Sequence, residues 1–182
     1  MKILFLFISV FIFSATCAGQ KTAADLKSSH ALVLEEFFSE NKQYQFLSSK
    51  VIDAEYLEYM RESFGENFEP FYRTADFNSD KIIDFAVILS RTGQRKETGA
   101  TSLEHKFAYP LAVVIFNGDK TGNFTKSFTE DIEAPLVCFL KVEGKKRKNL
   151  YFGVFESDAD IRIFKAAGKG YISEFLEEPG KD

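Results

Sequence analysis

The sequence is poor in the residue types on which most enzyme centres depend. Its 182 residues include no tryptophan, two histidines and two cysteines. The histidines, His30 and His105, are far apart in the chain, and there is no HExxH, GxSxG or P-loop motif. These absences give zinc chemistry and nucleophilic catalysis no support, so we expect a protein that is not an enzyme.

The N-terminus has the layout of a secretory signal peptide. Lys2 precedes an apolar run from Ile3 to Phe13, and small residues follow as far as Gly19. The run is shorter than the roughly 20 apolar residues that a membrane helix needs. We therefore predict a signal peptide at residues 1–19, export to the periplasm or the extracellular space, and no transmembrane segment after its removal. A lipid anchor at Cys17 is the alternative, although the residues before it fit lipoprotein processing poorly.

Few cysteines and a mild charge exclude two further classes. After removal of the predicted signal peptide one cysteine remains, Cys138, so the sequence predicts no disulfide framework. This thiol lies in the apolar run LVCFL, where we expect it to be buried. Removing Lys2 leaves 22 basic against 27 acidic residues, which predicts no nucleic-acid partner. The basic cluster at 145–148 is interpreted as a solvated turn between two strands.

Two helices are predicted in the N-terminal segment, residues 20–68. In the first, from Thr22 to about Asn41, apolar residues and His30 recur with helical spacing, which predicts one buried face. The second starts at Asp53 as N-cap and ends near Phe64, where Gly65 suits a left-handed cap. We expect its apolar stripe to consist of Leu57, Met60 and Phe64.

The remainder, residues 69–176, is predicted to be an antiparallel β-sheet region. Short runs rich in Val, Ile, Phe and Tyr alternate with turn residues at 85–89, 111–116, 136–140, 150–155 and 161–164. The first three runs are almost wholly apolar, so both faces of these strands should be covered. We predict an α+β fold with N-terminal helices packed on an antiparallel β-meander, in which both helices cover one face of the sheet. We expect one compact domain in all and a disordered tail at 177–182.

The stretch ADFNSDKIIDFAVIL is the strongest candidate for a binding site. Oxygen atoms stand at alternate positions before an apolar strand, and calcium takes about six to eight such ligands. The predicted metal ligands are the side chains of Asp76, Asn78, Asp80 and Asp84 and the carbonyl of Ile82. The alternative is an Asx-turn loop whose side chains bind backbone amides before the strand.

This stretch resembles the FG-GAP or VCBS-type repeat, whose signature is a DFNGDGKxD loop that enters an apolar strand. The similarity extends through LAVVIFNGDKTGNF and covers about Arg73 to Phe128, a minority of the chain. The resemblance implies an FG-GAP-like hairpin unit and calcium bound by Asp76, Asn78, Asp80 and Asp84. The chain departs from the signature at two glycines, replaced by Ser79 and Lys81. A lysine with positive φ costs on the order of 1 kcal/mol and brings an ammonium near the cation, and both effects oppose calcium binding.

Two functions are consistent with these features. The first is an exported, non-catalytic binding or structural domain that contacts another protein or a surface ligand and contains a calcium-stabilised loop. The second is a secreted or periplasmic inhibitor or immunity-type protein that blocks a partner enzyme. For the second we expect the long polar loop 90–110 to make the contact, because loops of this length are commonly functional.

Overall fold

The computed structural model describes residues 28–47, 52, 54–94, 96–98, 107–135, 137–145, 148–154, 160–168 and 170–176. The predicted signal peptide with Cys17, His105 and the tail at 177–182 lie outside these residues. In the described part of the chain, neither helix combines the length and the apolar character needed to cross a membrane.

One antiparallel sheet is built around two long central strands. These are β3 (Asp84–Arg91) and β5 (Phe107–Gly118), which pair with each other. The outer edge of β3 pairs with β1 (Tyr44–Phe46) and β2 (Tyr72–Ala75). On β5, β6 (Phe124–Ala134) pairs along one edge, and the short β4 (Lys96–Glu97) pairs near its start. This six-stranded sheet carries the loop with the predicted calcium ligands.

A second antiparallel sheet is a four-stranded meander. Its order is β10-β9-β8-β7, from β7 (Val137–Glu143), β8 (Asn149–Val154), β9 (Asp160–Ala167) and β10 (Gly170–Phe175). The edges of the two sheets meet where the Phe139 amide donates to the Pro70 carbonyl at 2.8 Å. The prediction of an antiparallel, β-rich α+β fold is confirmed, with two sheets in place of one meander.

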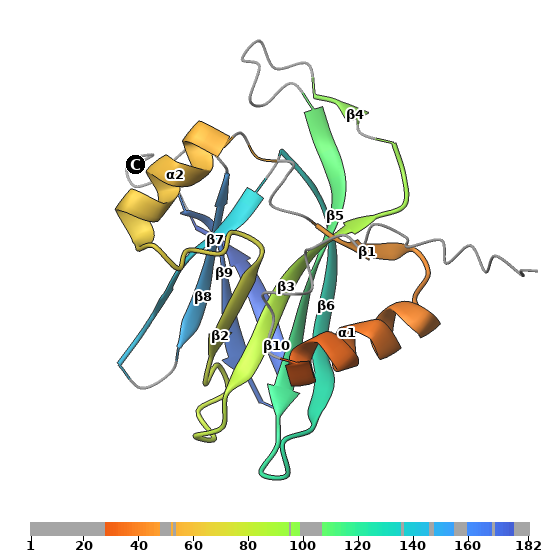
Figure 1. The fold of residues 1–182 in the computed structure, drawn as a ribbon, viewed down its shortest axis with the longest axis vertical. Helices are drawn as coiled ribbons and strands as arrows, with labels where there is room; N and C mark the ends of the chain where they lie inside the picture. The colour runs from red at the N-terminus through yellow and green to blue at the C-terminus, as the bar shows by residue number, and fades with distance from the viewer. Residues whose placement is uncertain are drawn as a thin grey trace, which may run out of the picture.

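Alternation along β3 explains why its apolar run is buried on both faces. Ala86 and Ile88 belong to a core shared with the second sheet, whereas Phe85, Val87 and Leu89 belong to a core against the first helix. All five are fully buried. Figure 1 shows β3 and β5 between the helix α1 and the blue strands of the second sheet.

The two helices cover different parts of this arrangement. Helix α1 (Ser28–Glu40) buries His30, Leu34 and Phe37, and ends where the Asn41 amide and side chain both donate to the Phe37 carbonyl. Helix α2 (Ala54–Phe64) buries Met60 in the core between the sheets. Our expectation that both helices cover one face of the sheet was wrong. Helix α1 packs in the core on one face of the first sheet, whereas α2 packs in the core between the two sheets.

The end of α2 follows the predicted capping chemistry but not the predicted stripe. Gly65 has φ 104°, and its amide donates to the Arg61 carbonyl at 2.8 Å. This is the left-handed cap expected of glycine. Phe64, predicted to be buried, is 39% exposed and stacks on Phe68 at a ring distance of 5.2 Å. The chain therefore presents an aromatic side chain at the surface next to the helix end.

Candidate functional site

Three of the predicted calcium ligands lie together in the loop between β2 and β3. The Asp80 amide donates to Asp76 Oδ1 at 3.0 Å and to Asn78 Oδ1 at 2.9 Å, so both oxygens approach one nitrogen. Asn78 Nδ2 in turn donates to Asp80 Oδ2 at 3.0 Å. The Ile82 amide donates to Asp80 Oδ1 at 2.8 Å. These contacts are those of the Asx-turn alternative, and they also gather three oxygen-bearing side chains at one corner.

The loop adopts positive φ at the two positions where the repeat signature has glycine. Ser79 has φ 68° and Lys81 has φ 70°, and they are the non-glycine residues with positive φ in the described part of the chain. The Lys81 amide donates to Asp76 Oδ2 at 3.0 Å, which holds this conformation in place. The prediction that Lys81 stands where a positive φ is required is confirmed.

Asp84 differs from the other predicted ligands because its side chain is fully buried. Its Oδ2 accepts from the amides of Phe77 at 2.8 Å and Asn78 at 3.3 Å, and its Oδ1 accepts from the Gly118 amide at 3.0 Å. Burial raises the pKa of Asp84, while the hydrogen bonds from these backbone amides lower it in part. The carboxylate therefore joins the loop to the hairpin between β5 and β6, and the turns of both lie at the lower end of Figure 1.

A tyrosine of the second sheet completes this buried polar group. Tyr171 of β10 donates to Asn117 Oδ1 at 2.6 Å and lies 3.5 Å from Asp84 Oδ2. Burial, followed by the charge of Asp84, raises the pKa of Tyr171. Gly118 is required here because a Cβ at this position meets the Ile83 carbonyl oxygen at 2.5 Å. Asp84, Asn117, Gly118 and Tyr171 thus connect β3, β5 and β10 at one point.

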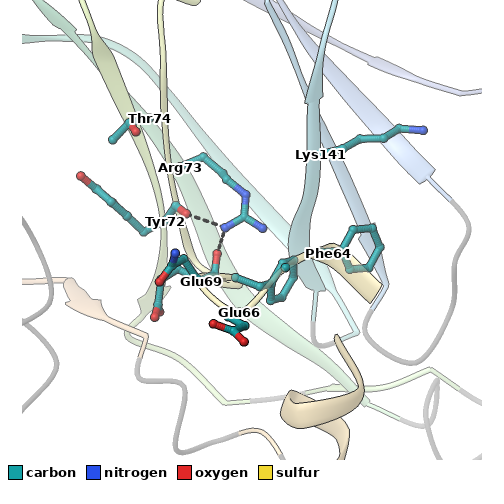
Figure 2. A pocket seen from close by; sticks show the side chains of 10 residues that line it. Phe64, Glu66, Glu69, Tyr72, Arg73, Thr74 and Lys141 are labelled. Atoms are coloured by element: carbon teal, nitrogen blue, oxygen red, sulfur yellow. Dashed lines mark hydrogen bonds between the residues drawn. The ribbon is translucent and has the colours of Figure 1, made fainter. Parts of the chain in front are cut away.

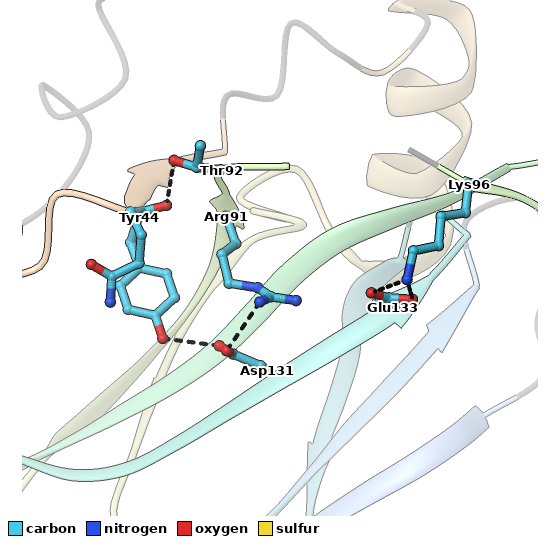
Figure 3. Close-up of polar contacts among 7 residues, drawn as sticks. Tyr44, Arg91, Thr92, Lys96, Asp131 and Glu133 are labelled. Carbon is cyan, nitrogen blue, oxygen red and sulfur yellow. Dashed lines mark hydrogen bonds and ion pairs between the residues drawn. The ribbon is translucent and has the colours of Figure 1, made fainter. Parts of the chain in front are cut away.

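The predicted loop 90–110 is partly strand. Arg91 ends β3, Lys96 and Glu97 form β4, and β5 starts at Phe107, while residues 95 and 99–106 lie outside the described part. Two contacts with β6 hold its base, Arg91 with Asp131 at 3.4 Å and Lys96 with Glu133 at 2.7 Å. Figure 3 shows both pairs, together with the bond from the Tyr44 hydroxyl to Asp131 at 2.9 Å.

A groove lies between the α2–β2 loop, β2 and β7, where the sequence indicated no site. Its volume is about 530 Å³, and its lining includes Phe64, Glu66, Phe68, Arg73 and Lys141. The Arg73 guanidinium donates to the carbonyls of Glu69, Tyr72 and Phe139 and lies 4.5 Å above the Phe68 ring. Burial lowers the pKa of Arg73 to about 10. Figure 2 shows this group between Lys141 on one side and the two glutamates on the other.

Among the described residues, no group of three or more histidine, cysteine, aspartate or glutamate side chains is placed to hold a metal ion. Calcium sites in proteins use amide and carbonyl oxygens as well as carboxylates, and the Asp76–Asp84 loop contains oxygens of these kinds. Each carboxylate oxygen has more than one lone pair, so it can accept a hydrogen bond from a backbone amide and bind a metal ion at the same time.

Comparison of the chain with protein-family models, with curated proteins and with solved structures gives no significant match. The likeness to the FG-GAP or VCBS-type repeat therefore depends on the residues of the loop and the following hairpin.

Proposed function

We propose that the chain is an exported, non-catalytic binding domain whose Asp76–Asp84 loop is stabilised by calcium. The observation that carries this proposal is the approach of the Asp76 and Asn78 oxygens to one backbone amide, with Asp80 beside them. The positive φ of Ser79 and Lys81, at the two glycine positions of the repeat signature, also supports it. In this proposal Asp76, Asn78 and Asp80 contact the cation from the loop, and Asp84 holds the loop on the sheet from behind.

Titration of the protein with calcium, followed by calorimetry and thermal unfolding, tests the metal part of the proposal. Calcium at about 100 times its Kd stabilises a protein by ~2.7 kcal/mol. For a chain of this size such a gain raises the Tm by about 5–10 °C. Asp80→Ala should abolish the shift, because it removes an oxygen donor while leaving Asp84 in place. No heat and no shift at millimolar calcium would reject the metal site.

Lys81→Gly provides a second arm of the same experiment. Glycine accepts positive φ freely and removes the ammonium, so we expect this variant to bind calcium more tightly than the natural chain. Without calcium it should be more stable by about 0.5–1 kcal/mol, since lysine strain in the left-handed region is relieved. Lys120→Gly is the matched control, because Lys120 is an exposed lysine of the neighbouring hairpin and does not have a positive φ. Equal responses of the two variants would contradict the proposed role of Lys81.

A second function, inhibition of a partner enzyme through the loop 90–110, is favoured by the way its base is held. Two ion pairs connect the end of β3 and the short β4 to β6, so the first part of the loop is held against the sheet. The charge reversal Glu97→Lys should abolish capture of a partner from an envelope extract while leaving the Tm unchanged. Unaltered capture by this variant argues against a contact through β4.

A further inference from the structure

The groove beside α2 has a separation of charge across its width. Arg73 of β2 and Lys141 of β7 lie on the strand side, whereas Glu66 and Glu69 lie on the side of the α2–β2 loop. Phe64 forms an aromatic wall between them, and its ring stacks on the buried ring of Phe68. A volume of about 530 Å³ is within the range of about 300–1,000 Å³ that small-molecule sites occupy.

Arg73 lines this groove, and its bonds to backbone carbonyls leave part of its hydrogen-bonding capacity unused. A guanidinium has five N–H donors, and three bonds to the carbonyls of Glu69, Tyr72 and Phe139 account for three of them. Among the described residues, no carboxylate lies within ion-pair distance of Arg73; the carboxylate of Glu69 acts on it from farther away. The three carbonyl partners are neutral and do not compensate the charge of the Arg73 guanidinium. An anion bound next to this partly desolvated cation would therefore lower its electrostatic energy.

The loop side supplies the opposite charge. Glu66 is exposed at the rim of the groove, and Glu69 is half-buried and pairs with Arg61 at 3.9 Å. Both carboxylates follow the C-terminus of α2, whose unpaired carbonyls carry partial negative charge and favour a cation. A ligand that fits the groove therefore carries an anionic group, a cationic group and an apolar body.

We propose that this groove binds a zwitterionic ligand, an apolar α-amino acid or short peptide. The carboxylate faces Arg73, the ammonium faces Glu66 and Glu69, and the apolar side chain packs on Phe64. This site is separate from the Asp76–Asp84 loop, and the inference goes beyond the calcium-stabilised domain proposed for it. Measurements in calcium-free buffer keep the two proposals apart.

Isothermal titration with four probes tests the ligand chemistry. L-phenylalanine represents the amino acid and alanyl-phenylalanine represents the peptide. The probe that binds more tightly shows which of these two ligand classes the groove prefers. N-acetyl-L-phenylalanine lacks the ammonium and L-phenylalaninamide lacks the carboxylate. Because hydrogen bonds to charged groups are among the strong ones, removal of either charge should weaken binding by about tenfold. No saturable heat with either zwitterion up to about 10 mM, or equal binding of all four probes, overturns the proposal.

Variants at the rim connect binding to the groove without disturbing the fold. Phe64→Ala removes part of the aromatic wall, and Glu66→Gln removes one exposed charge, with an expected loss of roughly two- to fivefold for the charge. Glu58→Gln, on α2 outside the groove, is the control and should bind like the natural chain. Arg73→Lys is informative if circular dichroism shows that it folds, since lysine keeps the charge but loses the donor geometry. Equal affinity of Phe64→Ala, Glu66→Gln and Glu58→Gln places the ligand elsewhere.

Discussion

Replacement of Asp84 by alanine should destabilise this protein more than any substitution in the exposed part of its loop. The carboxylate accepts hydrogen bonds from the amides of Phe77, Asn78 and Gly118. Phe77 and Gly118 are buried, so these two donors are left without water when the acceptor is removed. Each such donor costs about 1–3 kcal/mol. The loss of two buried bonds therefore predicts about 2–6 kcal/mol.

Part of this cost is offset by the removal of a buried charge. Burial raises the pKa of Asp84, which shows that its ionised form is less well solvated than in the unfolded chain. We therefore expect a net loss of about 3 kcal/mol, a large fraction of the 5–15 kcal/mol that is typical of whole proteins. Asp84→Asn should lose less, because its carbonyl oxygen can still accept at one of the two oxygen positions while its NH2 group meets the backbone N–H at the other.

Urea unfolding followed by circular dichroism measures these differences in free energy. Asp80→Ala is the matched control, since Asp80 is exposed and bonds within the loop. We expect it to cost about 1 kcal/mol or less in the absence of calcium. If Asp84→Ala unfolds within about 0.5 kcal/mol of the control, the buried carboxylate does not hold the loop on the sheet and the reasoning is wrong.

Two further predictions concern side chains whose pKa is raised by burial. Cys138 is fully buried, and burial raises its pKa to about 12. In a chain with Cys17→Ser, the Cys138 thiol should therefore resist a thiol reagent at pH 8 in the folded protein, and its labelling should increase with urea at the same midpoint as unfolding. Immediate labelling of the folded protein would contradict this. Tyr72 has its pKa raised to about 12 by burial, so its contribution to stability is complete below pH 10 and is lost as the pH rises through 12. The stability difference between the natural chain and Tyr72→Phe should narrow from pH 10 to 12, and a constant difference would refute the assignment.

Strands with a strong apolar signal were predictable, and strands without one were not. The run Phe85–Leu89 predicted the centre of β3, and the run at 111–116 predicted the centre of β5. Strand β6 was only partly indicated, because exposed polar residues such as Lys126, Thr129 and Asp131 alternate with half-buried ones. Strands β1 and β4 have three and two residues, too few for any periodicity. Their pairing depends on neighbours that are distant in the sequence.

The number of sheets could not be predicted for a related reason. A strand with apolar residues on both faces gives no period-two pattern, so it does not reveal which residues meet a helix and which meet another sheet. Phe85 and Ala86 are both fully buried, yet they belong to different cores. Placing α1 and α2 on one face was wrong because this division between cores is a tertiary property.

The Asp76–Asp84 loop shows the same limit at the level of single side chains. The spacing brought Asp76, Asn78 and Asp80 together in one loop, but it assigned the same role to Asp84, whose side chain is buried behind that loop. The contacts that distinguish Asp84 come from Gly118 and Tyr171, which are 34 and 87 positions away. The groove at Arg73 was missed for the same reason, because its walls come from the α2–β2 loop, β2 and β7.

The division of roles within the loop has a consequence for calcium. Aspartate and asparagine oxygens already satisfy the amides of Phe77, Asp80, Lys81 and Ile82, so the loop keeps its shape without a cation. Calcium should then add stability to a folded protein, and folding should not depend on it. Asp84→Ala should consequently lose stability with or without calcium, whereas Asp80→Ala should differ from the natural chain mainly when calcium is present. Unfolding of the natural chain by a calcium chelator alone would show that the amide contacts do not suffice.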